Sequence, residues 1–226
     1  VFMLQNKSAI KFDDVILDFE NQNDFINLNF DILEGEKAFV TGQNDKNRTL
    51  LLYLILGVSQ PSSGKVIVLD KNLRLLNKIK LFETRKKIGY AHPQRGLLRN
   101  ITVQENILLP ARFNYSIEYD FYKSRYEKII QLFDLSKYTD NLGWRLENII
   151  EKKALIARSI IHNPDILLLD EPTTYIEEKD KAEIKYLVDD VLPKEFLKET
   201  CSTIITTEDD DWAGLGANKI IDINAK

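Results

Sequence analysis

Three observations predict an α/β fold with a β-rich start, a mainly parallel sheet and an inserted helical subdomain. Short apolar strands alternate with helical segments along most of the 226 residues. Between residues 94 and 162 this strand signal is replaced by helical spacing. A continuous apolar run, residues 166–169, then ends in two carboxylates, Asp170 and Glu171. This pattern is typical of a buried parallel strand whose carboxyl end meets a functional site.

The first part of the chain has the alternation of apolar and polar residues that predicts strands. The expected strands cover residues 9–19, 25–33, 37–41, 65–69 and 87–91. A loop over 42–49 should lead into an apolar helix over 49–56, which Gly57 ends. Turns are expected at 34–35 and 61–64, and the basic cluster at 85–87 is interpreted as a solvated turn.

Helical spacing dominates the middle of the chain, and strands return near its end. The expected helices cover residues 103–109, 117–133, 147–161 and 177–191, and the later strands cover 166–169, 202–206 and 220–223. His162 follows a helix, where an imidazolium would suit the helix dipole. The whole of 1–226 is predicted to form one domain, with 94–162 as its helical subdomain.

Composition is that of an ordinary globular protein, with 44% hydrophobic and 29% charged residues. The 31 basic and 35 acidic residues give a net charge of −4, which disfavours nucleic-acid binding. Cys201 is the single cysteine, so no internal disulfide can form and a reducing cytoplasm is expected. No apolar run approaches the roughly 20 residues of a membrane helix. Any work at a membrane should therefore depend on a partner.

One long segment, ALIARSIIHNPDILLLDEPT from Ala154, resembles the ATP-binding subunits of ABC transporters. The resemblance extends over nearly the whole chain. It implies the ABC-ATPase fold, a mainly parallel sheet with an N-terminal antiparallel β region, a phosphate loop, an inserted helical subdomain and a closing strand. A second segment, TRKKIGYAHPQRGLLRNITVQENILLP from Thr84, resembles the ATPases of Mla/MCE-type phospholipid-trafficking systems. That likeness implies transport of a lipid or another small molecule.

The phosphate loop of this family corresponds to TGQNDKNRT, and it departs from the family pattern. Such loops use glycines to bring N–H groups onto phosphate oxygens and a lysine to reach the terminal phosphates. Here Asp45 and Asn47 stand at glycine positions and Arg48 stands at the lysine position, with Lys46 as a substitute ammonium. The simpler interpretation is a loop that only joins a strand to a helix. The resemblance implies these nucleotide-binding residues: Phe19 against adenine, Gly42, Asn44, Asp45, Lys46, Asn47, Arg48, Thr49 and Gln94.

The acidic pair after the apolar run matches the family pattern. The resemblance implies ATP and Mg²⁺ as cofactors, with Thr49 and Asp170 at the metal and Glu171 as the catalytic base. Other family elements are lost. Residues 146–150 read LENII where the family has its glycine-rich signature, Thr207 replaces a histidine, and Gln94 lies one residue late.

Losing several charge-stabilising groups predicts weak or absent ATP hydrolysis, because each such group contributes roughly 10²–10³ in rate. Three functions stay open. The favoured one is a degenerate cassette subunit that is cytoplasmic and peripheral at the inner membrane. It would be one of a dimer of ATPase subunits and would dock on a transmembrane permease. The alternatives are an active ATPase that uses unusual residues and a scaffold protein without a permease.

Overall fold

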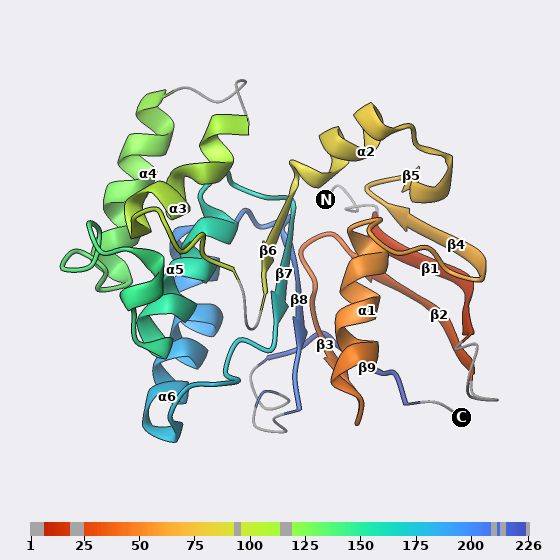
Figure 1. Cartoon of the computed structure of the whole chain (residues 1–226). Helices are drawn as coiled ribbons and strands as arrows, with labels where there is room; N and C mark the ends of the chain where they lie inside the picture. Colours follow the sequence, from red (N-terminus) through yellow and green to blue (C-terminus); the bar gives the residue numbers. More distant parts are fainter. Residues whose placement is uncertain are drawn as a thin grey trace, which may run out of the picture. The chain divides into compact units, whose positions relative to one another are not determined.

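A computed structural model describes residues 7–18, 25–92, 96–113, 119–208, 212 and 216–224 (Figure 1). The chain divides into two compact units. The first comprises residues 1–85 and 200–226, and the second comprises residues 86–199. The predicted helical subdomain, 94–162, falls within the second unit. Among the residues that the structure describes, no helix is both long and apolar enough to cross a bilayer.

The first unit opens with an antiparallel sheet, as predicted (Figure 1). Its strands, in spatial order, are β2 (Phe25–Leu33), β1 (Ser8–Asp18), β4 (Ser63–Val68) and β5 (Lys71–Asn72). Side chains of β1 alternate in burial, with Ile10 and Phe12 fully buried. The ring of Phe12 stacks on that of Phe30 with centroids 4.6 Å apart. This alternation buries one face of the sheet, as antiparallel sheets commonly do.

The turn predicted over residues 61–64 is wrong at its end, because β4 begins at Ser63. The strand starts early to pair with β1 across a bulge, where Asp13 faces Lys65 and Ile16 faces Ser63. Gly64 lies at this bulge with φ 82°. A Cβ on Gly64 would stand 2.2 Å from the carbonyl oxygen of Asp14, so only glycine fits.

The parallel part of the first unit is built on β3 (Lys37–Thr41), which lies between β8 (Ser202–Thr206) and β9 (Lys219–Asp222). The bounds of β3 and β8 are those expected from sequence. Phe39 of β3 is buried against the ring of Trp212, at a centroid distance of 6.0 Å. The carboxyl end of β3 leads directly into the loop at Gly42 and then into helix α1 (Asp45–Ile55).

Two helices of the first unit differ from the prediction. Helix α1 begins at Asp45 instead of Thr49, because the Asn44 side chain caps it. A second helix, α2 (Lys78–Arg85), follows the short 3₁₀ turn Leu73–Leu75 and was not predicted. The expected solvated turn at 85–87 is wrong for Arg85, which donates hydrogen bonds to the carbonyls of Leu56 and Gly57 at 2.7 and 2.9 Å.

In the second unit, β6 (Ile88–Ala91) pairs in parallel with β7 (Ile166–Asp170). The three helices expected before β7 are present and are nearly as long as predicted: α3 (Val103–Leu108), α4 (Tyr119–Leu132) and α5 (Asn148–Ile160). Short 3₁₀ turns cover Leu109–Phe113 and Gly143–Arg145. Helix α6 (Glu178–Tyr186) continues through a π-helical turn, Leu187–Val191, into α7 (Leu192–Glu195). Figure 1 shows α3, α4 and α5 gathered into one helical group.

His162 contradicts the prediction of a charged imidazolium at a helix end. The side chain is buried, and this burial lowers its pKa to about 4. The positive charges of Arg125 and Lys198 lower it further, while a hydrogen bond with the Ile88 backbone and the charge of Asp165 act in the opposite direction. The imidazole is therefore neutral at pH 7, because its loss of hydration outweighs the helix dipole.

The buried histidine should make the fold sensitive to mild acid. Its pKa is about 4 in the folded chain against 6.5 when unfolded, so between these values the unfolded state takes up more protons. The free energy of unfolding should therefore fall by about 2 kcal/mol between pH 7 and 5 on this account. Urea titrations of the wild type and His162→Gln at both pH values measure it. The decrease in the free energy of unfolding between pH 7 and 5 should be smaller in His162→Gln and unchanged in His92→Gln. An equal decrease in all three proteins would contradict the assignment of this effect to His162.

Candidate nucleotide site

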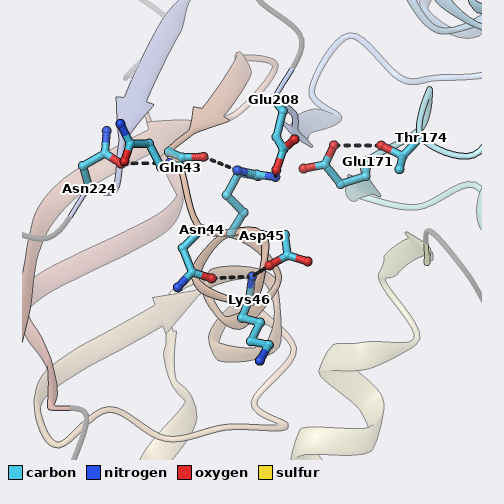
Figure 2. A network of polar contacts seen from close by, with 10 residues as sticks. Gln43, Asn44, Asp45, Lys46, Glu171, Thr174, Glu208 and Asn224 are labelled. Carbon is cyan, nitrogen blue, oxygen red and sulfur yellow. Dashed lines mark hydrogen bonds and ion pairs between the residues drawn. The ribbon is translucent and has the colours of Figure 1, made fainter. Parts of the chain in front are cut away.

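In the loop between β3 and α1, a backbone N–H group is hydrogen-bonded to side chains of the same loop (Figure 2). Gly42 takes φ 155°, and a Cβ there would lie 3.0 Å from the side chain of Ile223. The backbone N–H of Lys46 donates to the Asn44 side chain at 3.0 Å and to Asp45 Oδ1 at 2.7 Å. An N–H group that a nucleotide phosphate would need is thus already bonded to a carboxylate of the same loop.

Arg48 occupies the lysine position and is fully buried. Its guanidinium donates one hydrogen bond to the carbonyl of Gly42 and another to Glu208 Oε1 at 2.6 Å. The Glu208 side chain is 65% exposed, so the ion pair joins a buried cation to a carboxylate at the surface. A charge-assisted bond of this length is a strong one. The positive charge expected to meet phosphate is therefore neutralised from within the chain.

The C-terminal segment supplies a third internal partner. Asn224 Oδ1 accepts a hydrogen bond from the Gln43 N–H at 2.9 Å, and Asp222 Oδ1 holds the Asn224 amide at 2.7 Å. Figure 2 shows Asn224 reaching Gln43 from the neighbouring strand end. A pocket of about 550 Å³ opens beside these groups. It is lined by Thr41, Gly42, Gln43, Thr207, Glu208, Asp222 and Asn224.

The remaining predicted loop residues are placed along the start of α1. Asp45 and Lys46 are exposed, whereas Asn47 and Thr49 are half-buried. Figure 2 shows the Lys46 side chain extending away from Gln43 and Glu208, so its ammonium does not take the place of the missing lysine. The Gln43 and Lys46 N–H groups and the buried Arg48 guanidinium therefore all have partners within the chain.

The acidic pair lies in the second unit, at the end of β7. Asp170 is buried and accepts a hydrogen bond from the Tyr90 hydroxyl at 3.1 Å. Glu171 takes the left-handed conformation, φ 48°, and its carboxylate accepts a bond from the Thr174 hydroxyl at 3.1 Å. The strand thus ends in an ordered, strained turn that carries two buried acids.

Lys152 of α5 is a residue near this acidic pair that the sequence analysis did not single out. Its ammonium is buried and donates to the carbonyl of Glu171 at 3.0 Å. Burial lowers the pKa of Lys152 to about 8, although the charges of Asp170, Glu151 and Glu171 raise it. The sequence could have indicated this residue, because a lysine at a position expected to be buried in an amphipathic helix is unusual.

Several predictions stay untested. Phe19 and Gln94 lie outside the described residues. The phosphate loop belongs to the first unit, and Asp170 and Glu171 belong to the second. The structure brings Gly42, Asn44, Asp45, Lys46, Asn47, Arg48 and Thr49 together at one strand–helix junction. In the described ranges, no cluster of three or more histidine, cysteine or acidic side chains could hold a metal ion.

The comparison with protein families decides the identity. A family model described as "ABC transporter" matches residues 25–174. The chain belongs to the ABC transporter family. Among curated relatives, it is 28% identical to the lipoprotein-releasing system ATP-binding protein LolD of Leptospira interrogans, over 91% of this chain and 85% of that protein. It is 27% identical to a putative ABC transporter ATP-binding protein of Archaeoglobus fulgidus, over 98% of this chain and 89% of that protein.

Solved ABC cassettes have the same fold. The dimeric ATP-binding cassette MJ0796 bound to ADP and Pi superposes with a TM-score of 0.81 and 23% sequence identity, over 96% of each chain. The cbiO1 subunit from Clostridium perfringens gives 0.80 and 20%, over 97% of this chain and 87% of that one. The predicted ABC-ATPase fold, with an antiparallel N-terminal sheet and a parallel sheet, is therefore confirmed.

Proposed function

We propose that this ABC cassette is a degenerate subunit that binds nucleotide weakly or not at all and hydrolyses ATP at most slowly. One observation supports this most directly. Arg48, which stands in place of the phosphate-binding lysine, is buried and bonded to Glu208 at 2.6 Å. An incoming phosphate would have to displace a carboxylate from a desolvated cation, which is strongly unfavourable.

The backbone donors of the loop add to this cost. The Gln43 and Lys46 N–H groups are bonded to Asn224 and to Asp45. A phosphate would replace these bonds and would also bring its charge close to the Asp45 carboxylate. Because Asp45 is exposed, water and salt weaken that repulsion but do not abolish it. Binding energy must first break internal contacts, so affinity should be low.

Residues 146–150, which replace the family signature, also support slow or absent hydrolysis. Glu147 caps α5 without a side-chain hydrogen bond, and α5 begins at Asn148, inside the segment that replaces the signature. With no glycine between Leu146 and Ile150, this segment lacks close backbone approach to a γ-phosphate and carries a carboxylate instead. Asp170 and Glu171 are retained, yet they cannot act without a seated triphosphate.

As a working role, the chain would be one domain, 1–226, with 94–162 as a helical subdomain. It would dock on a transmembrane permease at the cytoplasmic side of the inner membrane. Relatives named for lipoprotein release and lipopolysaccharide export support a lipid cargo, and the dimeric cassettes among solved structures support pairing of two such subunits. Mg²⁺ would accompany any residual ATP.

Calorimetry with Mg-ATP tests this function. The wild type should give no saturable heat up to millimolar ATP, and a Thr49→Ala, Asp170→Ala variant should behave identically. Micromolar binding by the wild type that the double variant loses would overturn the proposal. In that case, hydrolysis that Glu171→Gln abolishes would establish an active ATPase built on unusual residues.

A further inference from the structure

Helix α2 and the 3₁₀ turn before it carry exposed apolar side chains in the first unit. Leu75 is 80% exposed and Ile79 is 74% exposed, and Phe82 on the next turn is also exposed. Apolar side chains grouped in this way mark interaction sites more often than chance exposure. We call Leu75, Ile79 and Phe82 the α2 surface.

Basic residues are frequent in the segment that carries the α2 surface. Residues 71–85 contain five basic residues and one acidic residue, in a chain whose net charge is −4. Arg74, Lys78 and Lys80 are exposed, and within the described residues they have no ion-pair partner. Their charges are therefore available to an anionic partner over a short range of about 10 Å in physiological salt.

The inner side of α2 is anchored. Thr84 is buried and accepts a hydrogen bond from Lys71 at 3.4 Å, while Arg85 is bonded to the carbonyls of Leu56 and Gly57. The exposure of the outer side is thus a fixed feature of a docked helix and does not come from a frayed one. Figure 1 shows α2 at the edge of the first unit, beyond β5.

We propose that the α2 surface binds the headgroup layer of an anionic lipid bilayer. Lysine and arginine would pair with lipid phosphates, and Leu75 and Ile79 would enter the boundary between headgroups and acyl chains. The combination of exposed aliphatic side chains with cations that have no ion-pair partner in the described residues, all within residues 74–82, favours a bilayer, which offers both negative charge and an apolar interior. This contact would be direct and would add to any contact made through a permease. It does not depend on the state of the nucleotide site.

Sedimentation of the purified chain with vesicles tests the proposal. The wild type should bind vesicles of phosphatidylcholine mixed with phosphatidylglycerol, and it should not bind phosphatidylcholine alone. Arg74→Gln, Lys78→Gln, Lys80→Gln should weaken binding more than tenfold, because each charge near such a surface is worth roughly a factor of five. Leu75→Ser, Ile79→Ser should weaken it at least tenfold with all charges kept.

A matched variant keeps the test specific. Lys123→Gln, Lys137→Gln, Lys179→Gln removes the same charge from exposed positions of the second unit and should leave binding nearly unchanged. Thermal unfolding checks that every variant is folded. Absence of vesicle binding by the wild type would overturn the proposal, as would equal losses in both lysine series. A photo-crosslink from position 79 to an acidic protein, without lipid binding, would overturn it too and assign the surface to a protein partner.

Discussion

Changing Asp45 and Asn47 to glycine and Arg48 to lysine in one chain should strengthen Mg-ATP binding at least tenfold without producing steady hydrolysis. The change removes the carboxylate that bonds the Lys46 N–H and the guanidinium that is paired with Glu208. Each charge-assisted hydrogen bond returned to a phosphate is worth about 1.5–3 kcal/mol, and about 1.4 kcal/mol corresponds to tenfold in affinity. Hydrolysis should stay absent because residues 146–150 still lack the signature. Calorimetry and phosphate release measure the two effects.

A single substitution tests the effect of the Arg48–Glu208 ion pair on ATP binding apart from the other changes in the loop. Glu208→Gln leaves Arg48 in place but removes its negative partner, so Mg-ATP binding should improve by a smaller factor than in the triple variant. Glu195→Gln breaks another exposed carboxylate's ion pair, with Lys128 at 2.6 Å, and serves as the charge-matched control. Steady turnover in the triple variant would contradict the effect assigned to residues 146–150. Equal effects of Glu208→Gln and Glu195→Gln would contradict the account of Arg48 as an internally neutralised cation.

Sequence reasoning succeeded where local pattern and packing agree. The bounds of β2, β3 and β8 are those predicted, because each strand is limited by a turn or loop and carries apolar residues that the core requires. Helix α2 was not predicted because two of its apolar residues, Ile79 and Phe82, are exposed. The spacing of apolar residues in the sequence therefore does not indicate which face of a helix would be buried. The start of α1 was misplaced because the cap at Asn44 lies within the motif that was interpreted as a loop.

The site could be predicted only in part, because its decisive contacts are long-range. Substitution of the lysine by Arg48 was evident from sequence, but its partner, Glu208, lies 160 residues away. The same holds for Asn224, which lies just beyond β9 and accepts a hydrogen bond from the Gln43 N–H. For His162, the prediction considered the helix dipole but not the loss of hydration on burial, which keeps the imidazole neutral. Motif spacing identifies which residues form a loop, whereas it does not reveal what those residues bond to.

Stability that rises with pH above neutrality is expected from Lys152. Its pKa is about 8 in the folded chain and 10.5 when unfolded, so between these values the unfolded state binds more protons. The sign is therefore positive: the free energy of unfolding should increase by about 3 kcal/mol between about pH 7.5 and 10.5 from this group alone. Urea titration at several pH values measures the increase.

Two variants isolate this contribution. Lys152→Met removes the titrating group and Lys152→Arg keeps its charge throughout the range, so both should lose the increase. Tyr126, whose pKa burial raises to about 12, favours the unfolded state above pH 10, but it is present in all three proteins and cancels in their comparison. At pH 7, Lys152→Met should also be more stable than the wild type by about 1–2 kcal/mol, because relief of the buried charge exceeds the lost bond to Glu171. The expectation is wrong if Lys152→Met is less stable than the wild type and its free energy of unfolding depends on pH as in the wild type. Attraction to the acidic neighbours would then outweigh the cost of burying the ammonium.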